Sequence, residues 1–310
     1  MKLIRGTVLS QSQHLPCVAT IGNFDGLHKG HRKIIAQIKA LAEQSNYPTT
    51  VISFEPLPTE FFSVKFAKPL PGRIYPYRDK ARILENLGVD EFVCLDFSTA
   101  LSEMEPESFI KDILLERLNI KHLVIGDDFR FGKQRRGDYQ MLCDVGAQYG
   151  MEVSNTATIE QDGKRISSTR IREYLAKGEL SKANPLLVDS YQLSGKVKHG
   201  DKRGRTIEFP TLNVSLPEDI IAARGAYAVR IYGLDGKTLK GVANIGNRPT
   251  VSGTETRLET HVFDFDEQVY GKHVCIELVE FLRAEEKFDS FDDLMAQITQ
   301  DSERAKALLG

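Results

Sequence analysis

Hydrophobic and polar positions follow two different patterns along the chain, and the change comes near residue 186. Before it, short apolar runs rich in β-branched residues alternate with longer stretches whose apolar positions recur every three or four residues. The short runs predict buried strands and the longer stretches predict amphipathic helices, an alternation typical of a parallel sheet with crossover helices. The expected strands are 18–22, 49–54, 91–95, 122–126 and 151–156, and the expected helices are 30–44, 78–87, 106–118 and 138–149.

After residue 187, glycines punctuate short runs in which apolar and polar residues alternate. This pattern predicts short strands joined by tight turns, in an antiparallel sheet or a small closed barrel. The expected strands are 226–232, 241–245, 257–265 and 273–282, followed by a final helix at 290–309. We therefore predict an α/β plus β fold, with a Rossmann-like parallel-sheet domain at 1–186 and a small antiparallel β-barrel with a terminal helix at 187–310.

The composition agrees with two globular domains and argues against several classes of function. The 310 residues contain 41 Lys and Arg against 43 Asp and Glu, so no basic surplus supports binding to nucleic acid or to an anionic membrane. The four cysteines are far apart and form no zinc-ligand spacing, which favours free thiols in a reducing compartment. No signal peptide or membrane span is found in the sequence, so we expect a cytoplasmic protein, and a weak homo-oligomer at most.

The first chemical constellation lies where the first expected strand meets the first expected helix. The run from Gly22 to His31 reads GNFDGLHKGH, and its glycines allow a phosphate to approach the backbone and the helix N-terminus. His28 and His31 share one helix face, so two imidazoles and the helix dipole can stabilise charge on a pentavalent phosphorus. The absence of G-x-G-x-x-G and of G-x-x-x-x-G-K-[ST] disfavours dinucleotide-dependent oxidoreductases and P-loop enzymes. The plainer alternative is that both histidines only cap and solvate a helix start.

A second run, ISSTRIR at 166–172, opens the last expected helix of the same domain. The hydroxyls of Ser168 and Thr169 and the guanidinium of Arg172 form a clamp suited to a polyphosphate. Taken alone, Ser168 or Thr169 is better explained as an N-cap.

A third run, GDDFRFG at 126–132, follows the fourth expected strand. Ligands of open parallel sheets bind beyond the carboxyl ends of the strands, so this loop is expected at the same edge of the sheet as the run from Gly22 to His31. Phe129 and Phe131 can contact a planar ring, while Asp127 or Asp128 can hold a hydrogen-bond donor or magnesium. A surface turn is the alternative.

The second domain contains another constellation. A loop at 194–205 alternates glycines with cations and can wrap phosphates, although basic residues on a solvated hairpin look similar. Its central members are Gly200, Lys202, Gly204 and Arg205. Thr211 and Asn213 point to the same side of an extended strand and can share a magnesium ion. Glu259, if it faces inward beside a phosphoryl donor, can take a proton from an attacking hydroxyl; on an outward face it would be a solvated glutamate.

Together these runs resemble the bacterial bifunctional riboflavin kinase and FAD synthetase family over nearly the whole chain. The matching segments are 22–31, 54–56, 126–132, 166–172, 200–213, 241–246 and 281–288. The resemblance implies an N-terminal nucleotidyltransferase domain that joins AMP to FMN and a C-terminal six-stranded β-barrel that phosphorylates riboflavin. It also implies riboflavin, FMN and ATP as small-molecule partners, with ATP as the co-substrate and Mg2+ as the cofactor.

The resemblance assigns roles to the candidate residues. Glu259 resembles the general base that deprotonates the terminal ribityl hydroxyl, while His28 and His31 would stabilise the transition state of adenylyl transfer. ATP would be held in the adenylyltransferase by Gly22, Asn23, Phe24, Asp25, Gly30, Ser168, Thr169 and Arg172, and in the kinase by Gly200, Lys202, Gly204, Arg205, Thr211 and Asn213. Magnesium would be held by Thr211 and Asn213. Flavin would contact Asp128, Phe129 and Phe131 in the first domain and Arg283 in the second.

The sequence departs from the family pattern at one position close to the expected kinase site. Glu208 stands where the family usually has glycine, and a carboxylate beside ATP phosphates is repulsive unless it turns outward or meets a cation. Three hypotheses follow: an enzyme with both activities, which the intact residues favour; an enzyme in which only the adenylyltransferase works; and a flavin-binding sensor or carrier without turnover.

Overall fold

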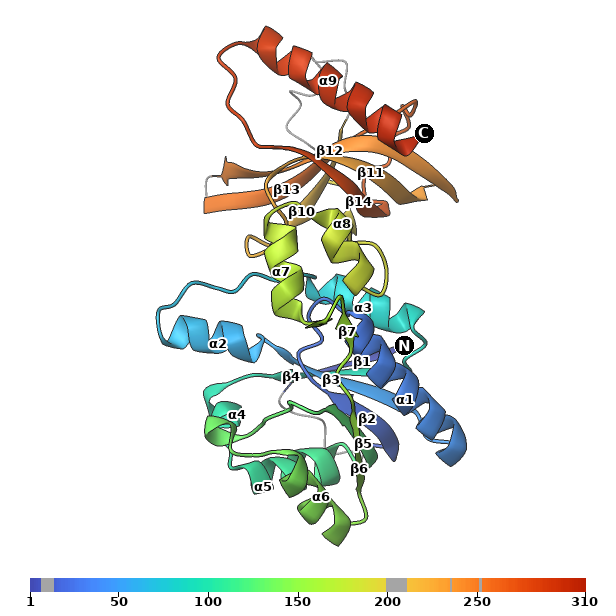
Figure 1. The fold of residues 1–310 in the computed structure, drawn as a ribbon, viewed down its shortest axis with the longest axis vertical. Helices are drawn as coiled ribbons and strands as arrows, with labels where there is room; N and C mark the ends of the chain where they lie inside the picture. Colours follow the sequence, from blue (N-terminus) through green and yellow to red (C-terminus); the bar gives the residue numbers. More distant parts are fainter. Residues whose placement is uncertain (7–13, 199–210, 235, 251–252) are drawn as a thin grey trace. The chain divides into compact units, whose positions relative to one another are not determined.

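The computed structural model describes residues 1–6, 14–198, 211–234, 236–250 and 253–310. The chain forms two compact units (Figure 1). The first contains Met1–Pro71 and Lys80–Ser167, and the second contains Gly72–Asp79 and Ser168–Gly310.

The first unit is built on a six-stranded sheet in which all neighbouring strands are parallel. In spatial order the strands are β1 (Lys2–Arg5), β4 (Glu91–Asp96), β3 (Thr49–Glu55), β2 (Cys17–Ile21), β5 (Ile120–Gly126) and β6 (Glu152–Thr156). The five expected strands are confirmed. β1 was not expected, because its four residues are mostly exposed and carry no continuous apolar run.

The helices of this unit agree with the expected ranges, with three additional segments. The helical segments are α1 (Lys29–Ser45), α2 (Pro58–Lys65), α3 (Tyr77–Asn86), α4 (Thr99–Ser102), α5 (Pro106–Ser108), η1 (Phe109–Arg117), η2 (Lys133–Arg135) and α6 (Tyr139–Gln148). The segment expected as one α-helix at 106–118 continues beyond α5 as the π-helical segment η1. α2 was missed because it has no apolar stripe: Glu60 is its only buried residue.

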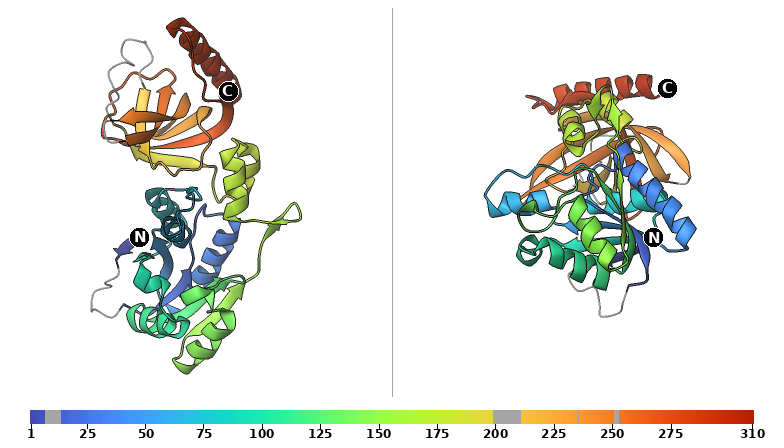
Figure 2. Two further views of the ribbon diagram at one scale, coloured as in Figure 1. Left: turned by 90° about the vertical axis from the view of Figure 1, so that its left-hand side faces the viewer. Right: turned by 60° about the horizontal axis from the view of Figure 1, so that its bottom comes forward.

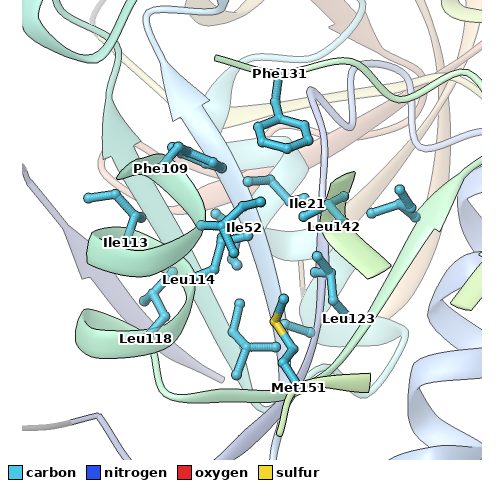
Figure 3. Packing of buried hydrophobic residues seen from close by; sticks show 14 of the residues in the cluster. Ile21, Ile52, Phe109, Ile113, Leu114, Leu118, Leu123, Phe131, Leu142 and Met151 are labelled. Carbon is cyan, nitrogen blue, oxygen red and sulfur yellow. The ribbon is translucent and has the colours of Figure 1, made fainter. Parts of the chain in front are cut away.

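The main hydrophobic core lies on one face of the sheet, between the strands and the η1 and α6 segments (Figure 3). Ile21 and Ile52 from the strands pack with Leu114 of η1 and Leu142 of α6. β2 places Cys17, Ala19 and Ile21 in this cluster, so its alternate residues face the other side, where α1 packs. Layers on both faces explain why β2 is buried along its whole length.

The second unit contains a six-stranded antiparallel barrel, as expected. Its strands are β10 (Thr211–Leu216), β13 (Gly253–Val262), β12 (Lys237–Thr250), β11 (Gly225–Leu234), β14 (His273–Ala284) and β9 (Gln192–Lys196), in spatial order. A bridge in which the Lys198 N–H donates to the Asn213 carbonyl at 2.8 Å joins the two edges of the sheet. The final helix α9 (Phe291–Leu309) packs along the outside of the barrel against β11, β12 and β14 (Figure 2).

The second unit also includes two pieces of chain that precede the barrel. One is the helical segment α7 (Ser168–Ala176), α8 (Leu180–Ala183) and η3 (Asn184–Leu186). The other is Gly72–Asp79, where the Ile74 carbonyl accepts a 2.8 Å hydrogen bond from the hydroxyl of the fully buried Tyr191. This packing does not test where two activities divide, so the boundary between residues 186 and 187 stays a prediction.

Candidate functional site

The histidine pair of the first unit lies in a tight turn between β2 and α1. The turn is anchored where the Gly22 N–H donates to the Ile52 carbonyl at 3.0 Å. Phe24 and Leu27 both adopt positive φ, 46° and 37°, and both are buried. Burial of these two apolar side chains offsets the cost of a backbone conformation that L residues rarely adopt.

The two imidazoles are stacked on one another at the start of α1. Their ring centroids are 3.8 Å apart with an interplanar angle of 16°, and the Phe24 ring lies 4.9 Å from that of His31. A Cβ on Gly30 would lie 3.0 Å from Cε1 and Nδ1 of His28. The missing side chain at Gly30 therefore leaves room for the His28 ring, and the close approach of a phosphate to this glycine stays a prediction.

Both histidines are uncharged near neutral pH. Burial, followed by the positive charge of Arg165, lowers the pKa of His28 to about 4. Burial, the neighbouring His28 and the ammonium of Lys80 hold the pKa of His31 well below its usual range. Neutral imidazoles can each donate one N–H to a phosphate oxygen, so the pair is suited to hydrogen bonding with a phosphate.

The 126–132 loop faces a small hairpin formed by β7 (Glu160–Gln161) and β8 (Lys164–Arg165). Arg165 Nη2 lies 2.6 Å from Asp128 Oδ2, and the Thr158 hydroxyl donates to both carboxylate oxygens of Asp127 at 2.8 and 3.0 Å. Since Arg165 also acts on His28, these contacts place the loop and the hairpin close to the histidine pair.

The two aromatic rings of that loop differ in burial. Phe131 is 7% exposed and belongs to the main core, 5.6 Å from the Phe109 ring (Figure 3). Phe129 stacks on it at 5.7 Å and keeps part of its surface exposed. Phe129 is therefore the ring with a face available to a planar ligand, and flavin contact by both rings stays a prediction.

The sequence analysis missed an aromatic cluster on and beside α2. The rings of Phe61, Phe62 and Phe97 lie within 6 Å of one another, and Phe62 also stacks on Phe66. α2 follows β3 at the carboxyl edge of the sheet, the edge from which the histidine turn also leaves β2. The repeated phenylalanines after the Phe54-Glu55-Pro56 match were the available signal.

The run predicted as a polyphosphate clamp, 166–172, is divided between the units: 166 and 167 belong to the first, and Ser168, Thr169 and Arg172 belong to the second. α7 begins at Ser168, as expected, and carries Thr169 and Arg172. Arg172 Nε donates to the Gly72 carbonyl at 2.9 Å. The histidines belong to the first unit, so a grip on one ATP shared between these residues and the histidines stays a prediction.

Strand register brings the second constellation together in the barrel. Asn213 of β10 lies directly opposite Glu259 of β13, and on the other side Glu259 lies opposite Asn244 of β12. Asn213 Nδ2 donates to the carbonyl and the hydroxyl oxygens of Thr211 at 3.2 and 3.4 Å. Thr211 and Asn213 thus act as neighbours, as their spacing predicts. Asn244 was missed because register between distant strands has no local signal.

Glu259 faces the outside of the barrel, which corrects the inward orientation that the sequence argument required. Its neighbours Leu258 and Thr260 are fully buried and fill the interior, so alternation puts Glu259 on the opposite face. It is nevertheless half-buried, with one carboxylate oxygen, Oε1, shielded from solvent. The position is therefore not that of the freely solvated surface glutamate of the plainer alternative.

Arg283 of β14 is held by the terminal helix. Its Nε and Nη2 atoms contact the buried carboxylate of Asp301 on α9 at 2.9 and 2.8 Å, and Gln297 Nε2 donates to the same carboxylate at 3.0 Å. This two-pronged contact fastens α9 to the barrel. A flavin contact by Arg283 stays a prediction.

Several expected kinase residues lie outside the described part of the chain. They are Gly200, Lys202, Gly204, Arg205 and Glu208.

Metal binding in the barrel would rely on few protein ligands. Among the residues that the structure describes, no group of three or more His, Cys, Asp or Glu could hold a metal ion. Thr211 and Asn213 offer neutral oxygens beside a carboxylate, a donor set that suits magnesium arriving with phosphate and water ligands. The residues therefore fit the predicted ion.

Comparisons with known proteins cover both units. A family model described as FAD synthetase matches residues 10–170, and one described as riboflavin kinase matches residues 187–309. The bifunctional riboflavin kinase/FMN adenylyltransferase of Escherichia coli (strain K12) is 43% identical over 100% of this chain and 98% of its own length. The protein of the same name from Haemophilus influenzae is 41% identical over 99% of both chains.

The solved structures include a close likeness of the whole fold. A Streptococcus pneumoniae protein described as a macrolide-efflux protein superimposes with a TM-score of 0.80 and 29% identity, over 99% of both chains. In the described part of our chain, no helix is both long and apolar enough to cross a membrane.

Proposed function

The chain belongs to the bifunctional riboflavin kinase/FMN adenylyltransferase family, and we propose that its two constellations divide the two reactions between them. Riboflavin and ATP give FMN and ADP at the Glu259 site. FMN and a second ATP give FAD and pyrophosphate at the histidine pair. The observation that carries this proposal is that each unit contains its own reactive set, a carboxylate flanked by amides in the barrel and two neutral imidazoles at a helix start.

In the barrel, Glu259 is the general base. Its carboxylate takes the proton of the terminal ribityl hydroxyl as that oxygen attacks the γ-phosphorus of ATP, and ADP leaves. Asn213 and Asn244 flank Glu259 on the two neighbouring strands by strand register. Thr211 and Asn213 would hold magnesium, which would supply positive charge beside the phosphates.

In the first unit, the nucleophile needs no base. The phosphate of FMN is already anionic at neutral pH and attacks the α-phosphorus of ATP, from which pyrophosphate leaves. Neutral His28 and His31 donate hydrogen bonds to the oxygens on which charge builds up. Asp128 and Phe129 contact the flavin. Ser168, Thr169 and Arg172, which belong to the second unit, stay the predicted partners of the leaving pyrophosphate.

The remaining expectations belong to the same proposal. The enzyme works on small molecules without nucleic acid or membrane, in the cytoplasm, and is a weak homo-oligomer at most. The near balance of 41 basic and 43 acidic residues supports the first of these points.

A time course with the purified full chain tests the proposal. The protein is incubated with riboflavin, ATP and Mg2+, and riboflavin, FMN and FAD are separated chromatographically. We expect FMN to appear first and FAD to follow. FAD formed from added FMN but not from riboflavin would leave only the adenylyltransferase, and flavin binding without ATP consumption would indicate a sensor or carrier.

A further inference from the structure

A buried lysine lies directly beneath the turn that carries the histidine pair. Lys80 of α3 is 3% exposed, and its Nζ donates to the carbonyl of Asn23 at 2.8 Å and contacts the Ser53 hydroxyl at 3.4 Å. The Ser53 hydroxyl donates to the same Asn23 carbonyl at 3.1 Å. One backbone oxygen of the turn is thus held by two side chains from two other elements, α3 and β3.

The carbonyl that they hold controls the next residue of the turn. Asn23 precedes Phe24, whose backbone is in the left-handed region at a φ of 46° and whose ring packs 4.9 Å from His31. Fixing the peptide plane at Asn23 therefore fixes the Phe24 ring, which in turn limits where the imidazole of His31 can lie.

Burying an ammonium group is costly even where it is well bonded, commonly by several kcal/mol per ion. An apolar side chain could fill this space without that cost, which suggests a use for the charge itself. The groups that face His31 are Phe24, His28 and the Lys80 ammonium, and the positive charge of Lys80 favours the neutral form of the imidazole.

We infer that Lys80 is a positioning residue of the adenylyl-transfer site, which fixes the turn through the Asn23 carbonyl and keeps a constant positive charge behind His31. The charge favours both a neutral, donating imidazole and the negative charge that develops on the transferred phosphoryl group. This inference rests on the proposed function of the histidine pair.

The main test compares Lys80→Met with Lys39→Met. Lys39 is half-buried and, like Lys80, donates to a backbone carbonyl, but its acceptor is Leu87, just after α3, at 2.9 Å, and not a residue of the histidine turn. We expect Lys80→Met to lower kcat for FAD formation from FMN about a hundredfold, with KM changed less than about threefold. FMN formation from riboflavin should stay unchanged, and Lys39→Met should stay within about twofold of the original chain in both reactions.

The pH dependence separates the charge from the hydrogen bond. Removing a positive neighbour raises the pKa of His31, so the acid limb of the adenylylation profile should move to higher pH in Lys80→Met. Ser53→Ala removes the second donor to Asn23 but keeps the charge, so it should lower kcat at most about fivefold and leave the acid limb in place. Lys80→Gln is a second neutral variant for use if Lys80→Met does not fold.

The effect of Lys80 on His31 can also be measured without any enzyme activity, so that this test does not depend on the proposed function. The imidazole of His31 can be titrated by NMR with 15N-labelled histidine, assigned with a His31→Gln variant. If the original chain forms no FAD from FMN, the proposed function fails, and an unshifted His31 titration in the neutral Lys80 variants would overturn the electrostatic role as well. If FAD forms but Lys80→Met matches Lys39→Met in kcat and in the His31 titration, Lys80 is only a structural residue.

Discussion

The two reactive constellations differ in the kind of group that each one buries. In the first unit, the reactive set is two stacked imidazoles, neutral by burial and by neighbouring cations, at the end of a parallel strand. In the barrel, the corresponding set is the half-buried carboxylate of Glu259, which lies in register with Asn213 and Asn244 on the outer face of an antiparallel sheet. One site offers hydrogen-bond donors without a base, and the other offers a base.

This difference matches the two nucleophiles. A phosphate monoester is an anion at neutral pH, so its attack needs stabilisation of charge and no proton acceptor. A ribityl hydroxyl must lose a proton, so its attack needs a base. Under the proposed division of the two reactions, the protonation state of the attacking group, more than the triphosphate common to both, decides which side chains each site needs.

Substitution of Glu259 should have the largest effect on one reaction alone. Glu259→Gln keeps the size of the side chain but removes the base, so FMN formation should fall about a thousandfold while FAD formation from FMN persists. Chromatographic assays of the two half-reactions measure this. Glu267→Gln, an exposed glutamate in the loop between β13 and β14, is the control and should behave like the original chain. Equal loss of both reactions would contradict separate sites.

Substitution of His31 should affect the other reaction, FAD formation, by a somewhat smaller factor. His31→Asn keeps a polar side chain but removes the stacked imidazole, so FAD formation should fall about a hundredfold through loss of one donor to the transition state. FMN formation from riboflavin should be unaffected in the same preparation. A histidine pair that could be replaced without loss of FAD formation would show that adenylyl transfer occurs elsewhere.

The neutral histidines should also make stability depend on pH. The pKa of His28 is lowered to about 4 in the folded chain from 6.5, so the unfolded chain binds more protons between these values. Stability is therefore complete above about pH 6.5 and is lost as the pH falls, by on the order of 2 kcal/mol at about pH 4.5. Urea unfolding at pH 7 and at about pH 4.5 measures this loss. The loss should shrink in His28→Gln, and an equal loss in that variant would assign it to other groups.

The smallest expected effects come from a matched pair of glycines. A Cβ on Gly30 would lie 3.0 Å from the His28 ring, and one on Gly246 would lie 2.9 Å from Asn244 Nδ2 and 2.7 Å from Glu285 Oε1. Gly30→Ala should lower only FAD formation and Gly246→Ala only FMN formation, each roughly fivefold, because the displaced group must shift by a few tenths of an ångström. Steady-state rates of both half-reactions, measured for each variant, test this assignment. The opposite assignment, or a loss in both reactions, would contradict the division of labour.

Local sequence patterns were enough to predict much of both units. Short apolar runs identified five of the six parallel strands, because strands covered on both faces are buried along their length, and a period of three to four residues identified the final helix. They also placed the histidines at the start of a helix and Thr211 beside Asn213, since both relations span only a few residues. β1 and α2 were missed because neither has a continuous or periodic apolar pattern.

What the sequence by itself determined is therefore most of the elements, the division into an α/β part and a β part, and the residue types available for phosphate chemistry. Tertiary structure decided the neutral state of the histidines, the alignment of Asn244 with Glu259, the outward face of Glu259 and the membership of Gly72–Asp79 in the second unit. The physical reason is distance along the chain: Lys80 and Arg165 reach the histidines only after folding, and strand register and burial depend on the same non-local packing.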